Sequence, residues 1–369
     1  MKRTFLIIQI LVAATVALTG CKHLYFDTEN VPDPETEVRI AYTNPVIDRG
    51  FPDPSVIQGE DGWFYIYCSD EGNQNLPIYR SRNLVDWTNT GKTIFTSYNR
   101  PSWANTTNFG LWAPDIAKVG DKYVLYYALA NFSNDDLAGG RNWGYGIGAA
   151  VASSPTGPFT DKGCILRSGE IRVQCSIDPC YYEDNGTRYL IWGSFFGLWA
   201  IELAEDGLSV KEGAEKILLA GSRGAAWGLE AAMVHYRDGF YYLFGSCNGT
   251  GYTENYQLTV YRSESFLGPY VARDGSPAIN SHRVGETLIQ GGSHWISPGH
   301  SSEIITDKAG EDWVFFHAYK NGDQSARRLL LEKISWVDGW PELGISETLE
   351  DGTAIKTPTW DSSAAPKFE

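Results

Sequence analysis

Basic residues are scarce in this sequence relative to acidic ones. The chain contains 30 Lys and Arg residues against 45 Asp and Glu residues, which gives a formal net charge of −15 at pH 7. An acidic surface repels phosphate backbones and anionic membrane surfaces. The composition therefore argues against a nucleic-acid-binding protein, and it is compatible with a neutral partner such as a glycan.

The cysteines suggest neither a zinc site nor a full set of disulfide bonds. The sequence has no Cys-x-x-Cys pair and no His-rich cluster. If Cys21 is modified, five of the six cysteines remain, and an odd number argues against a disulfide framework. Cys175 and Cys180 are close enough in sequence to pair in an oxidising compartment, although spacing alone does not establish a bond. The alternative is a set of buried thiols.

Helical periodicity is also missing. Short apolar segments rich in Tyr, Phe and Trp recur between turns that carry Gly, Pro or Asp, with no evident amphipathic helix. Aromatic residues make up 14% of the chain. They favour β-structure, and they also offer flat surfaces on which sugars can stack. Short strands at regular spacing predict an all-β fold.

The N-terminus carries an apolar run, Phe5 to Leu18, preceded by Lys2 and Arg3. The run is too short for an ordinary membrane span, and it ends in small residues before Cys21, as in a bacterial lipoprotein. The alternative is a plain secretory peptide with an incidental cysteine. We predict a lipoprotein signal peptide over residues 1–20, then a lipidated Cys21 and a polar tether over residues 21–40. The predicted location is the bacterial cell envelope, in the periplasm or on the surface.

A repeated unit occupies most of the remaining chain. Each copy contains a short strand, a turn rich in Asp, Gly and Lys, and an aromatic-rich strand, with a third strand following. The five copies begin at Asp53, Ala113, Asp178, Glu230 and His300. Repeats spaced by roughly 40 to 70 residues indicate a propeller or a solenoid. We predict a five-bladed β-propeller over residues 41–345, with residues 346–369 as an edge strand and tail.

The first residues of the five copies form a column of unusual chemistry. In a propeller the first strand of each blade is the innermost, so these positions should face the central axis. Four of the five are ionisable and three are carboxylates. Carboxylates gathered at one axis repel one another, which indicates a functional reason for placing them there. The alternative is a set of polar caps on strand ends.

Two carboxyl groups set across a pocket are typical of glycoside hydrolysis. One must be protonated to release the leaving oxygen, and the other must be ionised to activate water or attack carbon. A third carboxylate near the acid would raise its pKa. Asp53, Asp178 and Glu230 supply this set, and the longer Glu230 is the candidate to reach the glycosidic oxygen. Asp53 heads the first copy and Glu230 the fourth, so the two side chains should face each other across the axis. This arrangement predicts a distance between their carboxyl groups of about 6.5–9.5 Å, which is typical of inverting enzymes.

Several motifs together resemble glycoside hydrolase family 43 over residues 44–341. They are FPDPS at 51–55, LWAPDI at 111–116, SIDPCYY at 176–182, the repeat at Glu230 and PGHSSEI at 298–304. The segments 261–263 and 268–271 are similar to the arabinanase-like branch. The resemblance implies a five-bladed propeller and an inverting mechanism. In it, Asp53 would be the general base, Glu230 the general acid, and Asp178 the residue that orients the acid and tunes its pKa.

The same resemblance implies further site residues. Substrate-binding candidates are Phe51, Trp112, Ser194, Phe195 and Arg327, with Trp112 as a sugar platform. For Phe51, core packing is the alternative, and Arg328 lies next to Arg327. His300 resembles a central histidine beside a calcium or sodium ion; the alternative is a hydrogen-bonded core histidine without an ion. No organic cofactor is expected. Asp115, two residues past the column, is predicted to make either a catalytic contact or a turn or inter-blade hydrogen bond.

The resemblance also directs the choice of substrate. Arabinanases typically carry Pro two residues after the acid, whereas Glu230 is followed by Ala231 and Ala232. The chain has no length for the large β-sandwich usual in the β-xylosidase branch. We therefore predict hydrolysis of α-L-arabinofuranosyl linkages in plant arabinan by a monomer. The alternatives are an exo-acting arabinofuranosidase, a β-xylosidase or galactosidase, and a glycan-binding propeller without activity.

Overall fold

The computed structural model describes residues 41–69, 75–96, 98–104, 109–130, 143–222, 228–280, 285–343 and 355–359. The predicted signal peptide, lipidated cysteine and tether lie outside these residues. Among the described residues, no helix is both long and apolar enough to cross a membrane.

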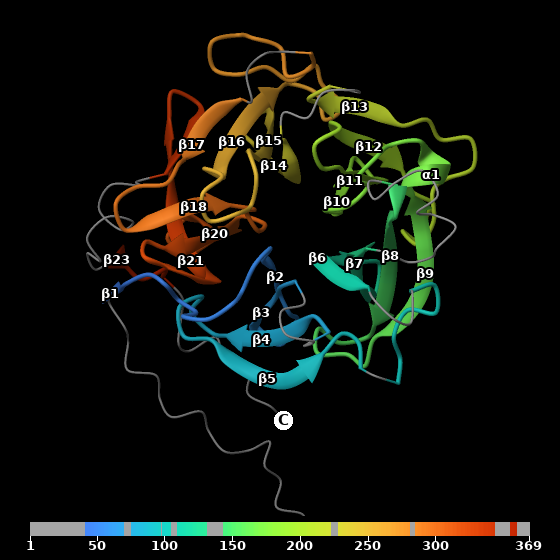
Figure 1. The fold of residues 1–369 in the computed structure, drawn as a ribbon, viewed down its shortest axis with the longest axis horizontal. Coiled ribbons are helices and arrows are strands. Elements are labelled where there is room, and N and C mark those ends of the chain that lie inside the picture. The colour runs from blue at the N-terminus through green and yellow to red at the C-terminus, as the bar shows by residue number, and fades with distance from the viewer. Residues whose placement is uncertain are drawn as a thin grey trace, which may run out of the picture. The chain divides into compact units, whose positions relative to one another are not determined.

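The described chain forms five antiparallel sheets arranged as a five-bladed β-propeller, which confirms the predicted fold class (Figure 1). Blade 1 contains β2 (Ser55–Gln58), β3 (Phe64–Tyr67), β4 (Pro77–Ser81) and β5 (Thr88–Thr93). Blade 2 contains β6 (Gly110–Val119), β7 (Lys122–Ala130), β8 (Tyr145–Ala152) and β9 (Thr160–Arg167). Blade 3 contains β10 (Cys180–Asp184), β11 (Thr187–Trp192), β12 (Leu198–Glu202) and β13 (Ile217–Ala220).

The last two blades follow the same order of strands. Blade 4 contains β14 (Glu230–Arg237), β15 (Phe240–Cys247), β16 (Gln257–Ser263) and β17 (Glu286–Ile289). Blade 5 contains β18 (Trp295–Gly299), β20 (Asp312–Lys320), β21 (Asp323–Val337) and β22 (Trp340–Leu343), and β19 (Ile305–Thr306) also pairs with β20. One short helix, α1 (Ser168–Ile171), connects blades 2 and 3. The strands β2, β6, β10 and β14 surround the centre of the ring in Figure 1.

Two-residue hairpin loops join the first two strands of blades 2, 3 and 4. In blade 3, Asp184 pairs with Thr187, so the loop consists of Asn185 and Gly186 alone. Both loop residues have a positive φ, 49° and 82°. Asn and Gly are the residues that tolerate this conformation, and a turn of this hand matches the twist of the flanking strands. The local sequence thus fixes the strand register within the blade.

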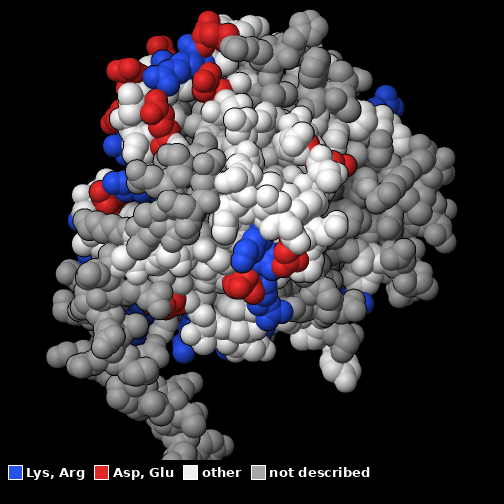
Figure 2. All heavy atoms as spheres, turned by 60° about the vertical axis from the view of Figure 1, so that its left-hand side comes forward, with Lys and Arg blue, Asp and Glu red and all other residues white. Residues whose placement is uncertain are grey.

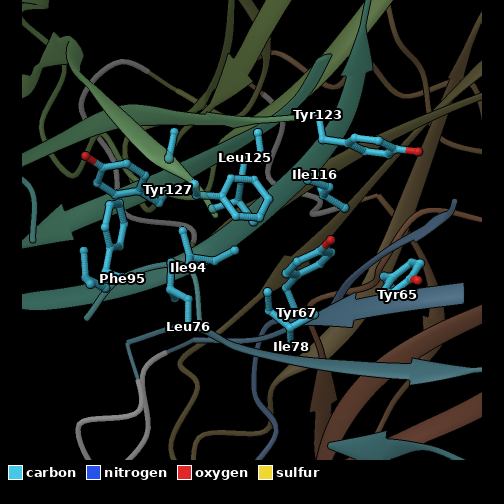
Figure 3. Packing of buried hydrophobic residues seen from close by; sticks show 14 of the residues in the cluster. Tyr65, Tyr67, Leu76, Ile78, Ile94, Phe95, Ile116, Tyr123, Leu125 and Tyr127 are labelled. Carbon is cyan, nitrogen blue, oxygen red and sulfur yellow. The ribbon is translucent and has the colours of Figure 1, made fainter. Parts of the chain in front are cut away.

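The hydrophobic core consists of layers between neighbouring blades. Adjacent residues of one strand point to opposite faces of the sheet. Tyr127 accordingly packs with residues of blade 1 and Tyr126 with residues of blade 3. In blade 5, Phe315 faces blade 1 and Phe316 faces blade 4. Both faces of the second strands are therefore buried, which explains why these strands are continuously apolar. Figure 3 shows the layer between blades 1 and 2.

The ring closes through contacts between the start of the propeller and blade 5. The Tyr42 hydroxyl donates a hydrogen bond of 2.8 Å to the carbonyl oxygen of Leu331, and the Asn44 side chain donates one of 3.1 Å to the same oxygen. β1 (Ala41–Tyr42) also pairs with β23 (Ile355–Lys356), which lies in the segment predicted to hold an edge strand. Residues from both ends of the described chain thus seal blades 5 and 1 together.

The described cysteines form no disulfide bond. Cys175 packs in a small cluster around Tyr145, whereas Cys180 belongs to the core layer between blades 3 and 4. Because their side chains enter different layers, the possible Cys175–Cys180 pair is not formed.

The acidic charge is dispersed on the face that Figure 2 shows, where acidic and basic side chains lie in small mixed groups between uncharged areas.

Candidate active site

The predicted axial column holds in four blades and is displaced by one residue in the other. Asp53, Ala113, Asp178 and His300 all have a left-handed backbone, with φ of 56°, 42°, 55° and 54°. In blade 4 the residue with this backbone is Ala231, with φ of 56°. Glu230 therefore precedes the column, and the predicted alignment was wrong by one position there.

Strand pairing gives the same placement of Glu230. In blade 4, Glu230 pairs with Ser246 before the register shifts. In blade 2, Trp112 pairs with Ala128 before an equivalent shift. Glu230 thus occupies the backbone position of Trp112. Its carboxyl group nevertheless lies near Asp178, because its charge contributes to raising the pKa of Asp178. An alignment of LEAAM at 229–233 with LWAPD at 111–115 gives the same placement without gaps.

Asp53 is buried and surrounded by hydrogen-bond donors. Its Oδ1 lies 3.2 Å from Arg327 Nη1 and 3.2 Å from His300 Nδ1. The Ser69 hydroxyl donates to its other carboxylate oxygen. Burial alone would raise the pKa of Asp53, but the charges of Arg327 and His300 hold that pKa well below its usual value. Asp53 is therefore the carboxylate that stays ionised.

His317, which was not predicted from the sequence, binds the backbone of Asp53. Its Nδ1 accepts a hydrogen bond of 3.1 Å from the backbone N–H of Asp53. Burial and the charge of Arg327 lower the pKa of His317 well below its usual value. The ring is therefore neutral with its proton on Nε2, a buried atom that has no hydrogen-bond partner among the described residues. Tyr256 stacks on the ring with centroids 5.7 Å apart.

Asp178 and Glu230 occupy a different electrostatic environment. Burial, together with the charges of Glu230 and Asp53, raises the pKa of Asp178 to about 8. Burial also raises the pKa of Glu230. Asp178 Oδ2 accepts a hydrogen bond of 3.2 Å from the N–H of Ala231, and Glu230 Oε2 accepts one of 2.5 Å from the Ser194 hydroxyl. Both groups therefore retain protons to a higher pH than ordinary carboxyls.

A recurrent serine near the end of the second strand organises these groups. Ser69 bonds to Asp53, and its hydroxyl accepts the N–H of Ala113 at 2.8 Å. Ser246 accepts the N–H of His300 at 2.8 Å. Ser194 bonds to Glu230. These serines end the copies IYCS, LFGS and IWGS, so the repeated Ser was a signal that the sequence carried for two of these unpredicted residues, Ser69 and Ser246.

The predicted substrate-binding residues separate into two groups. Trp112 is half-buried, and its ring lies 6.1 Å from that of Tyr145. Phe195, next to Ser194 in the sequence, is half-buried. Phe51, by contrast, is 1% exposed and packs edge-on against Tyr79, so the structure supports the core-packing alternative for it. Ser194 is also buried, and its hydroxyl bonds to Glu230.

Arg327 and its neighbour point to different partners. Arg327 reaches Asp53, as described above, whereas Arg328 binds Asp48 at 2.7 Å and Asp323 at 2.5 Å. Successive residues of a strand face opposite ways, so one arginine enters the site and the other leaves it. The choice of Arg327 over Arg328 agrees with this geometry.

The comparisons with known proteins can now be placed beside this site. A model of glycosyl hydrolases family 43 matches residues 42–341. The chain belongs to this family. It is a glycosidase, and its site joins a carboxylate held ionised to two carboxyls that retain protons, the division of roles that glycoside hydrolysis requires.

Individual relatives in the family are similar over most of their length. Extracellular endo-α-(1→5)-L-arabinanase 1 of Bacillus subtilis is 29% identical over 299 residues, covering 78% of this chain and 86% of the relative. Extracellular exo-α-(1→5)-L-arabinofuranosidase ArbA of Cellvibrio japonicus is 28% identical over 315 residues, covering 80% and 86%. The structure of Cellvibrio cellulosa α-L-arabinanase with arabinohexaose matches with a TM-score of 0.69 and 26% identity, covering 82% of this chain and 98% of that one.

The site of this family 43 chain offers few protein ligands for an ion. Among the described residues, no group of three or more His, Cys, Asp or Glu side chains is arranged to hold a metal. His300 faces Asp53 through Nδ1, and its pKa is raised by the charge of Asp53 despite burial, which favours the imidazolium. An ion near His300 would therefore draw most of its ligands from water. The calcium or sodium ion stays a prediction.

A second pair of buried carboxyls, Asp115 and Glu303, links the blades. Asp115 Oδ2 accepts a hydrogen bond of 2.8 Å from the N–H of Tyr181 in blade 3. Glu303 accepts bonds from the Ser55 hydroxyl at 2.7 Å and the Val56 N–H at 2.6 Å in blade 1. Burial and the charge of Glu303 raise the pKa of Asp115 well above its usual value. Of the two alternatives for Asp115, the inter-blade hydrogen bond is the one observed.

Proposed function

We propose that the chain hydrolyses α-1,5-linked L-arabinofuranosyl bonds of plant arabinan with inversion of the anomeric configuration. The observation that carries this proposal is the opposite tuning of Asp53 on one side and of Asp178 and Glu230 on the other. Pairs of carboxyls whose environments push their pKa values apart are the acid and base of such reactions. The choice of arabinan is supported by relatives whose names give this substrate.

In the proposed reaction Glu230 gives its proton to the glycosidic oxygen as the bond to the anomeric carbon breaks. Asp53 accepts a proton from the water that attacks this carbon on the opposite face. Arg327 and His300 keep Asp53 ionised. Asp178 and Glu230 resist simultaneous ionisation, and this repulsion holds a proton on the pair to a higher pH. Trp112 offers its half-buried ring to the sugar. The protons gained and lost balance, since the acid ends ionised and the base ends protonated.

Product analysis tests the proposal. Purified protein is incubated with linear arabinan, branched arabinan, xylan and galactan, and the first-formed product is followed by NMR. Release of arabino-oligosaccharides with an inverted anomeric centre is expected from linear arabinan. Retention would contradict the mechanism, and activity on xylan or galactan without activity on arabinan would contradict the substrate.

The exo alternative has its own support, because one relative is named an exo-acting arabinofuranosidase. Endo action releases a range of oligosaccharides and lowers the viscosity of arabinan early in the reaction. Exo action releases one short product with little change in viscosity. The same incubation therefore distinguishes the two modes.

The role of Asp178 gives a prediction about pH dependence. Asp178→Asn keeps an acceptor for the N–H of Ala231 but cannot ionise, so it removes the negative charge that Asp178 gains beside Glu230 as the pH approaches its pKa of about 8. Without this charge the acid loses its proton at a lower pH, so the alkaline limb of the kcat profile should move down by about one pH unit. Rates measured from pH 4 to 9 check this. An unchanged profile with full activity would remove Asp178 from the mechanism.

We also propose that Cys21 carries the lipid that anchors the protein in the cell envelope. The relatives above are named extracellular enzymes, which agrees with export. Stable attachment needs two or more acyl chains, which lipoprotein processing supplies. Cys21→Ser should move the protein from the membrane fraction to the soluble fraction, as measured by fractionation and immunoblotting. Wild-type protein found wholly in the soluble fraction would contradict the anchor.

A further inference from the structure

A cavity of about 550 Å³ lies between blades 2 and 3. Its walls come from the loop after α1, from the end of the loop before β13, and from three aromatic residues (α1 and β13 in Figure 1). The aromatic residues are Trp143, Phe196 and Trp199, and the polar ones include Arg172, Glu215 and Lys216. We call this cavity the blade 2–3 groove. Its volume falls in the range of about 300–1,000 Å³ that is usual for ligand sites.

Phe196 in the wall of the groove lies close in sequence to the partner of the proposed acid. This residue follows Ser194, whose hydroxyl bonds to the Glu230 carboxyl, by two positions. Phe196 also packs against the cluster that contains Trp112. Its carbonyl oxygen accepts a hydrogen bond of 2.9 Å from Trp199 Nε1, which holds this wall in place. A chain of sugars that passes from Trp112 and Ser194 along Phe196 would enter the groove.

The side chains of the groove suit a neutral, hydroxyl-rich ligand. Trp143 is half-buried and offers an aromatic surface, whereas Trp199 is buried beneath Lys216. Arg172 and Glu215 are exposed, and within the described part of the chain neither forms an ion pair. Charges of both signs around one cavity do not select an anion or a cation. They do supply donors and acceptors for sugar hydroxyls, as glycan sites require.

We propose that the blade 2–3 groove binds arabinofuranosyl residues on the leaving-group side of the bond that is cut. The leaving group is the part of the substrate that the acid protonates, so it lies beside Glu230 and its partner Ser194. This inference rests on the proposed arabinan hydrolysis. It assigns Trp143 as the stacking residue of the groove and Arg172 as a hydrogen-bond donor to the sugar hydroxyls.

The test follows the position of cleavage in α-1,5-arabinohexaose labelled with ¹⁸O at its reducing end. The wild type is compared with Trp143→Ala and Arg172→Ala, and Tyr236→Ala serves as a control, because Tyr236 is 52% exposed on blade 4 outside the groove. Loss of one stacking contact should lower kcat/KM for the hexaose by about tenfold for Trp143→Ala. Cleavage in both groove variants should move toward the reducing end, since fewer sugars are then held beyond the acid.

The outcomes separate this inference from the function on which it rests. A wild type that releases nothing from arabinan contradicts the proposed function. If the wild type cleaves arabinohexaose and both groove variants keep its rate and cleavage pattern, the groove does not bind substrate. A shift of cleavage toward the non-reducing end would place the groove on the other side of the bond and would overturn the assignment. Arg172 is exposed, so Arg172→Ala tests the groove even if Trp143→Ala folds poorly.

Discussion

Replacement of Glu230 by glutamine is expected to lower kcat on linear arabinan by about 10²- to 10⁴-fold. Glutamine has the size of glutamate and can accept the hydrogen bond from Ser194, so the local structure should persist. Its amide group has no acidic proton to give to the glycosidic oxygen. Initial rates of reducing-sugar release measure the effect, with Glu202→Gln in blade 3 as a control at a residue that binds Lys211 outside the site.

The leaving group distinguishes an acid from a residue that merely supports the fold. An aryl arabinofuranoside with an acidic phenol departs without protonation, so Glu230→Gln should keep much of its activity on that substrate. A structural defect would lower both rates together. Wild-type activity of Glu230→Gln on arabinan would contradict the assignment of the acid.

Replacement of Asp53 by asparagine should cost a similar factor, about 10²- to 10⁴-fold, on every substrate. The expected loss does not depend on the leaving group, because the base activates water in either case. Asparagine is preferable to alanine at this position, since Asp53 has a φ of 56° and Asn tolerates the left-handed conformation. The variant can therefore retain the backbone that presents residue 53 to Arg327 and His300.

Asp238→Asn is the matched control for this variant. Asp238 also has a left-handed backbone, with φ of 50°, but it lies in the hairpin between β14 and β15 of blade 4. Circular dichroism and thermal unfolding should show a folded protein for both variants. Loss of activity on arabinan and on the aryl substrate is expected for Asp53→Asn alone. Full activity of Asp53→Asn on arabinan would contradict its role as the base.

Local patterns in the sequence determined the fold and part of the site. Each copy of the repeat encodes its own hairpin, for example through Asn185 and Gly186, and the apolar second strands require burial on both faces. A ring of blades satisfies this requirement because every blade lies between two neighbours. The positions of Asp53, Asp178 and His300 followed from the same repeat, since one local motif sets the same backbone at the start of each blade.

The tertiary structure decided which atoms meet and which groups hold protons. Asp53 is ionised because of Arg327 and its N–H is bound by His317, residues 274 and 264 positions away in the sequence. Glu230 lies one position before the column, at the position that Trp112 occupies in blade 2, as the strand pairing of the two blades shows. Phe51 became a core residue because Tyr79 from a neighbouring strand covers its ring. The repeats determine the strands and turns of each blade separately, whereas the burial of the site residues, their pKa values and their contacts across the axis depend on the closure of all five blades.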